Sequence, residues 1–341
     1  MQTHLAEYSL LPTKTKPIFR LLAAACLVFS QFFFLGCGSR PLASITVGVP
    51  PLEQNALLYI AAEKRFFKRN GITVAIKDFP SGPAAIAATV SGLADIAETA
   101  EFPFVVAVMR GQQLRILAIN DRFENDYLVG REDRGITTIP SLKGKRIGVT
   151  FGTITDFYLD RFLLLNGISS NQVAKVDVPP SAFVQSLLDG SVDAVVAWQP
   201  FVAEMLSQKR NAFAVWTVQS SQPVFGMVVC EGSWLSGHGK LAVAFLRSLA
   251  QAEEFLNSHP REARTIVAKT LNYSMDYMTG VWPQHEFSLT LGFSVIAAME
   301  DEASWLVEKK LADQKQIPDF AGLIYRDGLN VVSRQSVNLM Q

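Results

Sequence analysis

Residues suited to binding a small molecule follow the predicted strands of this chain. They lie in short loops that hold amide, hydroxyl, carboxylate and indole groups, with glycines that let a ligand approach the backbone. In a doubly wound α/β sheet, ligands bind outside the carboxyl ends of the strands. This rule selects ten candidate ligand-binding residues, which are Gln54, Asn55, Ser81, Gly82, Glu101, Gly152, Thr153, Thr155, Trp198 and Gln199.

The segment 152–156 (GTITD) opens a predicted helix. Helix N-termini expose unpaired N–H groups and a positive dipole, which suit an anionic or carbonyl group of a ligand. The alternative is a capping box, with Thr153 as the cap and Asp156 three residues later. The two interpretations are compatible, because the remaining N–H groups stay available to a ligand.

Trp198 ends an apolar strand, where its indole could stack on a ligand and donate its N–H; the alternative is packing at the rim of the fold. The acids Glu53, Glu98, Glu101 and Asp121 lie near the predicted loops, and such charges are more often solvated rim residues. The loops contain no Lys or Arg. They therefore favour a small organic solute with a planar or apolar body over a bare inorganic anion.

The sequence contains no recognisable catalytic set. His4, His238, His259 and His285 are scattered, and none falls in a predicted strand-end loop. The Gly-x-Ser-x-Gly, His-Glu-x-x-His and Gly-x-x-x-x-Gly-Lys motifs are absent. We predict a chain that is not an enzyme and needs no metal or cofactor, with a periplasmic enzyme on the same fold as the alternative.

Strands and helices alternate along the first third of the chain, which predicts an α/β fold of mostly parallel sheets flanked by helices. Strands are expected over 44–49, 73–79 and 95–97, and helices over 55–70 and 83–91. After residue 239 the chain becomes mainly helical, with helices expected over 240–258, 261–270, about 274–278, 289–299 and 301–311.

An internal near-repeat predicts two lobes of one topology. The matches are VGVP at 47–50 with IGVT at 147–150, RFFKRNGI at 65–72 with RFLLLNGI at 161–168, and VSGLADI at 90–96 with LDGSVDA at 188–194. Segments 114–120 and 223–229 are expected to cross between the lobes as a hinge. The predicted organisation is lobe 1 over 37–120, lobe 2 over 121–222, and a return to lobe 1 with C-terminal helices over 223–341.

The N-terminus predicts export. Three basic residues precede the apolar run 21–36, which is shorter than the about 20 residues of a membrane-spanning helix. The run ends in Phe34-Leu35-Gly36-Cys37, which resembles a lipoprotein cleavage site with Phe34 in place of the usual Leu. We predict a signal peptide over 1–36 and a lipid on Cys37, with an uncleaved anchor helix as the alternative.

The predicted mature chain carries little net charge and one cysteine besides Cys37. Removal of residues 1–36 leaves 305 of 341 residues and a net charge near −2, which does not fit nucleic-acid binding. Cys230 then has no disulfide partner other than Cys37, the predicted lipid site, and its apolar neighbours indicate a buried strand.

Several stretches resemble the substrate-binding proteins of nitrate/sulfonate/taurine-type ABC importers. These are the leader and, within residues 45–225, the stretches ITVGV, LLYIAAEKRFFKRNGITV, SGLADIAETAEFP, LKGKRIGVTFGT and DGSVDAVVAWQPF. The resemblance implies a type II periplasmic binding protein fold that hands its solute to an ABC permease with a cytoplasmic ATPase. We expect the protein to act as a monomer. A sensor subunit that feeds a membrane kinase is an alternative with the same binding physics.

The same superfamily includes binding proteins for pyrimidine precursors of thiamine, and an enzyme branch with a cysteine cluster and active-site histidines. This chain lacks that cluster, since Cys230 is its one cysteine after Cys37. The aromatic and polar groups of the predicted loops, with no Lys or Arg among them, favour a sulfonate with an organic body or a pyrimidine-like heterocycle as the solute, in preference to nitrate.

Overall fold

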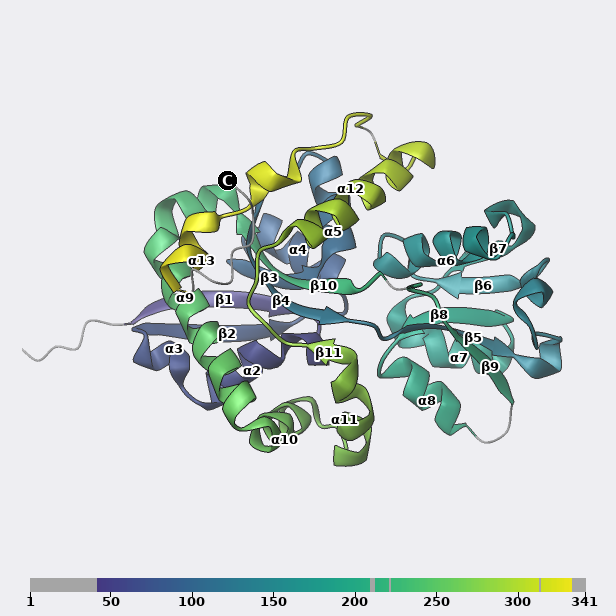
Figure 1. Ribbon diagram of the computed structural model, residues 1–341, viewed down its shortest axis with the longest axis horizontal. Helices are drawn as coiled ribbons and strands as arrows, with labels where there is room; N and C mark the ends of the chain where they lie inside the picture. The colour runs from purple at the N-terminus through teal and green to yellow at the C-terminus, as the bar shows by residue number, and fades with distance from the viewer. Residues whose placement is uncertain (1–41, 209–211, 221, 313, 333–341) are drawn as a thin grey trace, which may run out of the picture. The chain divides into compact units, whose positions relative to one another are not determined.

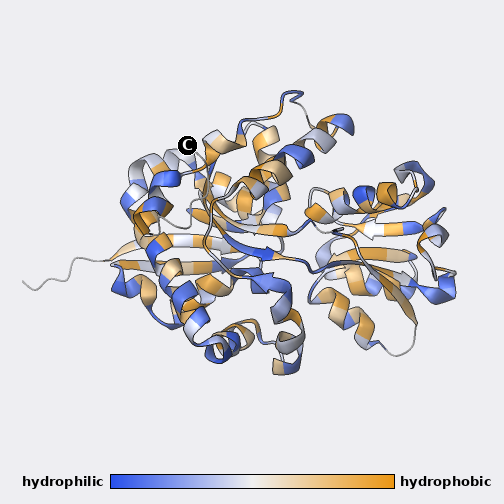
Figure 2. Ribbon diagram, in the orientation of Figure 1, coloured by the Kyte–Doolittle hydropathy of each residue, from blue (hydrophilic) through white to orange (hydrophobic). Residues whose placement is uncertain are grey.

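The computed structural model describes residues 42–208, 212–220, 222–312 and 314–332 (Figure 1). The predicted signal peptide and Cys37 lie outside these residues. Residues 42–341 fall into one unit that contains two β-sheets with helices packed on them. Hydrophobic residues dominate the strands of both sheets, as the α/β pattern of the sequence requires (Figure 2).

The first sheet has six strands in the order β11-β4-β10-β3-β1-β2. Their bounds are Ala43–Val49 for β1, Ile72–Asp78 for β2, Ile96–Ala100 for β3, Leu114–Phe123 for β4, Val224–Glu231 for β10 and His285–Glu286 for β11. β1 pairs in parallel with β2 and β3, whereas β10 is antiparallel to both β3 and β4. Cys230 is fully buried in β10, so its prediction as a core residue is confirmed.

The second sheet has five strands in the order β7-β6-β8-β5-β9. Their bounds are Asp126–Arg131 for β5, Arg146–Val149 for β6, Ala174–Asp177 for β7, Ala194–Trp198 for β8 and Phe213–Thr217 for β9. β6 is parallel to β7 and β8, and β5 is antiparallel to β8 and β9. The expected α/β fold is therefore confirmed, with sheets that are mixed because β5 in the second sheet, and β10 and β11 in the first, run against their neighbours.

The helices cover both sheets and extend through the C-terminal third (Figure 1). Their bounds are Ala56–Glu63 for α2, Phe66–Arg69 for α3, Gly82–Val90 for α4, Glu101–Met109 for α5, Ile154–Leu165 for α6, Phe183–Asp189 for α7, Phe201–Ser207 for α8, Gly232–Ser258 for α9, Pro260–Leu271 for α10, Met275–Val281 for α11, Phe293–Glu308 for α12 and Arg326–Val332 for α13.

Two helix predictions were wrong. The helix expected over 55–70 is broken between α2 and α3 at Arg65, which adopts a left-handed conformation with φ 59°. The two helices expected over 289–299 and 301–311 are instead the single helix α12, because Glu300 and Asp301 are compatible with a helix interior and no Gly or Pro interrupts it.

The near-repeat has the same structural role in both sheets. Asn70 and Asn166 each end a helix with a side-chain amide that donates to the carbonyl four residues earlier, at 3.0 and 2.8 Å. Asp95 and Asp193 directly precede β3 and β8, and each accepts a backbone N–H from the neighbouring parallel strand, from Thr46 of β1 at 2.7 Å and from Arg146 of β6 at 2.9 Å. The matched motifs therefore mark one local topology used twice.

The chain crosses from the six-stranded to the five-stranded sheet between β4 and β5, and returns between β9 and β10. A second contact joins helices packed on the two sheets. Phe157 of α6 lies against Phe102 of α5 at a centroid distance of 6.0 Å and against Trp305 of α12 at 5.7 Å. The indole N–H of Trp305 donates to Asp160 of α6 at 3.2 Å.

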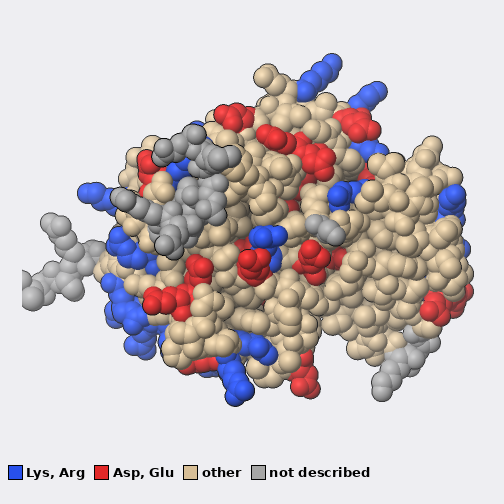
Figure 3. Space-filling model, viewed as in Figure 1, with Lys and Arg blue, Asp and Glu red and all other residues tan. Residues whose placement is uncertain are grey.

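Charged side chains of both signs occur on the face in Figure 3, in keeping with a formal net charge of zero for the whole chain. Within the described residues, no helix is both long and apolar enough to cross a membrane.

Candidate functional site

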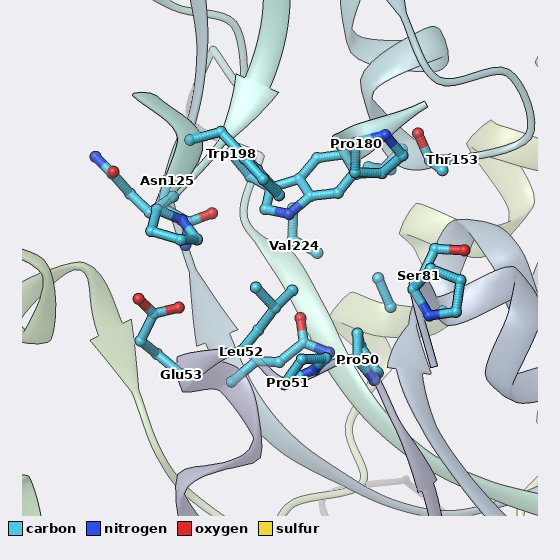
Figure 4. Close-up of a pocket in the computed structure, with 18 of the residues that line it drawn as sticks. Pro50, Pro51, Leu52, Glu53, Ser81, Asn125, Thr153, Pro180, Trp198 and Val224 are labelled. Atoms are coloured by element: carbon cyan, nitrogen blue, oxygen red, sulfur yellow. The ribbon is translucent and has the colours of Figure 1, made fainter. Parts of the chain in front are cut away.

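The loops at the strand ends of both sheets line one pocket of about 630 Å³. From the first sheet come residues 50–54 after β1 and 78–83 after β2, and from the second come 153–154 after β6, 179–181 after β7 and 198–201 after β8. Figure 4 shows Trp198 on one side of this pocket and Pro50, Pro51 and Leu52 on the opposite side. The rule that ligands bind at carboxyl strand ends thus selected the loops that form this pocket.

Six of the ten candidate residues line the pocket: Gln54, Ser81, Gly82, Thr153, Trp198 and Gln199. Ser81 and Thr153 precede α4 and α6, so the pocket receives the N-terminal ends of two helices. Free N–H groups at such ends favour an acceptor or anionic group of a ligand.

The other four candidates do not line this pocket. Asn55 is buried and donates from Nδ2 to the carbonyl oxygen of Pro50 at 2.5 Å, which fixes the loop after β1. Glu101 accepts the backbone N–H of Phe225 at 3.0 Å, where β10 begins. Thr155 is buried and shares a hydrogen bond with Thr153, while Gly152 lines a separate, smaller hollow.

The capping box expected at 153–156 is wrong. Thr153 stands at the cap position, but its hydroxyl bonds to the carbonyl oxygen of Thr150 at 2.7 Å and to Thr155, not to the helix N–H groups. The Asp156 carboxylate instead forms an ion pair with Lys175 at 2.7 Å. The first N–H groups of α6 are therefore left without a side-chain cap.

The solvated-rim interpretation of the four acids is also wrong, because all four are buried. Burial raises the pKa of Glu98 to about 8, although Asn120 donates to it at 3.0 Å. Glu53 accepts the hydroxyl of Tyr277. The fourth acid, Asp121, faces His285 and is described with it below.

Trp198 is held by two aromatic rings at the pocket wall. Phe183 and Phe201 meet its indole edge-to-face, with centroid distances of 5.3 and 6.1 Å. Its Nε1–H is buried and has no hydrogen-bond partner among the described residues. Rings packed in this way fix the indole, and its unpaired N–H remains available to a ligand.

Sequence reasoning missed several polar residues of the pocket, and three of them bear on its chemistry: Asn125, Asp126 and His285. Asp126 begins β5, which is antiparallel to β8, so it lies directly opposite Trp198. Because β5 runs antiparallel to β8, the start of β5 lies beside the carboxyl end of β8. A search restricted to the carboxyl ends of strands therefore misses residues at the start of β5. His285 lies in the two-residue strand β11, whose sequence carries too short a pattern to predict.

The polar groups of the pocket are acidic rather than basic. Burial raises the pKa of Asp126 to about 7, and neither of its carboxylate oxygens has a partner among the described residues. The described lining residues also include Glu53 and Asp78, and they include no Lys or Arg. An anion therefore finds no basic side chain in this part of the chain.

His285 is paired with a buried acid. Its Nδ1 lies 2.6 Å from Asp121, and its ring is stacked between Phe123 and Phe287 at centroid distances of 5.3 and 5.1 Å. Burial opposes the charge on the imidazole and Asp121 favours it; the net effect is a raised pKa of His285. The pair has no net charge wherever its proton lies, so it does not make the pocket basic.

Proline is the most frequent residue in the pocket wall. Eight prolines line it: Pro50, Pro51, Pro80, Pro83, Pro103, Pro179, Pro180 and Pro200. Each fixes its own φ and offers no N–H, so the wall is apolar and rigid between its few polar groups. Such a pocket suits a small organic molecule with a planar or apolar body.

Residues 53–263 match the model of the family described as NMT1/THI5 like. A Haemophilus influenzae protein whose description names thiamine biosynthesis is 29% identical over 214 residues, which are 61% of this chain and 67% of that protein. The taurine-binding periplasmic protein of Escherichia coli is 26% identical over 203 residues, covering 58% of this chain and 62% of that protein.

A solved structure shares the fold across most of the chain. It is the alkanesulfonate-binding protein from Xanthomonas axonopodis bound to MOPS, with a TM-score of 0.73 and 18% identity over 83% of this chain and 98% of that one. The likeness supports the two-sheet fold described above, and at 18% identity it does not identify the solute of this chain.

Proposed function

The chain belongs to the NMT1/THI5-like family, and from this premise we propose that it is the solute-binding component of an ABC import system. The observation that carries the proposal is the pocket of about 630 Å³ lined by strand-end loops of both sheets. A solute bound there contacts both halves of the protein at once. Its binding therefore favours closure of the two halves about the segments that join the sheets, between β4 and β5 and between β9 and β10.

The proposal includes the whole route of the solute. The protein is exported to the periplasmic or extracytoplasmic side, held by a lipid on Cys37, and acts as a monomer with lobe 1 over 37–120 and 223–341 and lobe 2 over 121–222. The closed form delivers the solute to a membrane permease with its ATPase. The relatives' descriptions, which include a taurine-binding periplasmic protein, support this class of function.

The solute is a small organic molecule and not nitrate. Trp198 and the proline-rich wall provide a surface for a planar or apolar body, and the starts of α4 and α6 provide donors for an acceptor group. Nitrate has no body to cover this wall. A sulfonate-like and a pyrimidine-like solute both satisfy these two features.

A thermal-shift panel tests the proposal. Nitrate, sulfate, taurine, alkyl and aryl sulfonates, and aminopyrimidines are added to the purified protein, and native mass spectrometry searches for a co-purified solute. A true solute at a hundredfold excess over its Kd stabilises the fold by about 2.7 kcal/mol. Trp198→Ala should remove that stabilisation, and Trp216→Ala, outside the pocket lining, should not. Stabilisation by nitrate alone, equal in all three proteins, would overturn the proposal.

A hydrolytic enzyme is the second candidate, because the Asp121–His285 pair resembles a general base held by a carboxylate. The Nε2 of His285 has no partner in the described part of the chain, so no hydroxyl or thiol there is positioned as its nucleophile. Mass spectrometry of a bound solute after prolonged incubation separates the two functions: an unchanged solute supports transport, and a cleaved one supports an enzyme.

A further inference from the structure

Asp126 is a buried carboxylate that the fold leaves without a partner. It begins β5, in the interior of the second sheet between β8 and β9, and its exposed fraction is 1%. Its backbone N–H donates to Gln219 at 2.9 Å, which fixes the main chain. Neither side-chain oxygen has a hydrogen-bond partner among the described residues.

A carboxylate in this state is costly unless something else satisfies it. Buried polar groups are nearly always hydrogen-bonded, and exceptions ask for an explanation. Asp126 lines the pocket, so the group that satisfies it can arrive with the solute. No Lys or Arg lines the described wall, so the missing partner is not a basic side chain of the pocket.

The neighbours of Asp126 indicate the chemistry of that partner. Trp198 lies directly opposite it in the β5–β8 ladder, and residues so paired present their side chains on the same face. A cation is attracted by the face of an indole as well as by a carboxylate. Asn125, which also lines the pocket, adds a buried carbonyl oxygen without a partner in the described chain. Figure 4 shows Asn125 and Glu53 on the same side of the pocket, so acceptor groups gather there.

We infer that Asp126 is a specificity-determining residue that binds a planar, positively charged N–H group of the solute, of the amidine type. Two parallel N–H groups on such a cation match the two free oxygens of one carboxylate. The inference rests on the proposed function and narrows it. A nitrogen heterocycle protonated beside an amino group fits this position, and a sulfonate group does not.

An anionic group at this position meets three unfavourable features. It would approach Asp126 itself, with Glu53 and Asp78 also in the lining. His285 does not compensate, because it already faces Asp121. An anionic or acceptor group of the solute belongs instead near Ser81 and Thr153, which lie together on another side of the pocket (Figure 4).

Three probes of nearly one shape test the inference: benzamidine, benzamide and benzoate, which carry charges of plus one, zero and minus one near neutral pH. Their binding to the purified full-length protein is measured by isothermal titration calorimetry at about pH 8, where Asp126 with a pKa of about 7 is ionised. We expect benzamidine to bind about tenfold to a hundredfold more tightly than benzamide, and benzoate to bind weakest.

Asp126→Asn then keeps the shape and removes the charge. Benzamidine should lose about tenfold or more in affinity, and the order of the three probes should flatten. Glu98→Gln is the matched control, because Glu98 is a buried carboxyl outside the pocket lining, and it should leave the order unchanged. The probe series on the unmodified protein is decisive by itself if the variant does not fold.

Tighter binding of benzoate than of benzamidine would overturn the inference, and so would an unchanged order in Asp126→Asn. Absence of binding by all three probes would overturn it as well. The proposed function is judged separately, because tight binding of an aryl sulfonate in the thermal-shift panel would sustain solute binding while refuting the cationic group.

Discussion

The unpartnered carboxylate of Asp126 should destabilise the ligand-free protein, and removing its charge should show by how much. The perturbation is Asp126→Asn, which replaces one carboxylate oxygen by an NH₂ group and leaves the backbone contact with Gln219 in place. The prediction concerns stability and not binding. It holds whatever the solute is.

The magnitude follows from the pKa of Asp126, which burial raises from an ordinary 3.8 to about 7. Below 3.8 the carboxyl is protonated in both the folded and unfolded chains and has no effect. As the pH rises to about 7, the unfolded chain ionises first and stability is lost. Each pH unit corresponds to about 1.4 kcal/mol, so the full loss is about 4 kcal/mol.

The assay is urea denaturation of both proteins from about pH 4 to about pH 8.5. The buried amide of the variant has its own desolvation cost, but that cost does not depend on pH. The stability of Asp126→Asn relative to wild type should therefore rise by about 4 kcal/mol across this range. The charge of Asp126 raises the pKa values of Glu101, Tyr127 and Tyr158. Its removal makes Glu101 easier to ionise in the folded protein, which further increases the stability of the variant relative to wild type as the pH rises.

Asp327→Asn provides the control, because this carboxyl is exposed on α13, and its effect should stay within about 1 kcal/mol at any pH. A stability difference between Asp126→Asn and wild type that does not change with pH would refute the reasoning. It would mean that the Asp126 carboxylate is stabilised in the folded protein by a hydrogen-bond donor or cation that the described residues do not include.

Three further predictions concern other parts of the chain. Cys37→Ser should abolish incorporation of labelled palmitate and block maturation; a mature wild-type N-terminus other than Cys37 would contradict the lipoprotein prediction. Phe157→Ala should lower the free energy of unfolding by about 3–5 kcal/mol in urea, because it empties the contact among α5, α6 and α12, whereas Phe151→Ala, at a side chain that is 49% exposed, should change it little. Asp121→Asn should lower the pKa of His285, because it removes the carboxylate that stabilises the charged imidazole, and NMR of the imidazole protons reads this change; an unchanged titration would show that the ion pair does not hold the proton.

The sequence predicted the strand-end loops well because their signals are local. Asn-Gly after a helix, and Gly before an Asp that directly precedes a strand, have fixed backbone roles, so their recurrence marked both sheets. The loops that contain Ser81, Thr153 and Trp198 followed directly from the ends of those strands.

Asp126 and His285 could not be found in this way, because their positions depend on strand direction. Asp126 reaches the pocket only because β5 is antiparallel to β8, and His285 only because the two-residue β11 pairs with the end of β4. The burial of Glu98 and Asp121 was hidden for a related reason. A charged residue in a strand looks solvated until its neighbours across the sheet are known.

The eight prolines of the pocket wall have a thermodynamic consequence. A wall with few backbone amides has few hydration bonds to break when a solute arrives, and its fixed φ angles lose little conformational freedom. Calorimetry should therefore record a pronounced negative heat-capacity change and only a small entropic loss from the wall itself. The enthalpy of binding would then come chiefly from the few polar contacts, so it would measure the strength of the hydrogen bonds and charge interactions made by the polar groups of the solute.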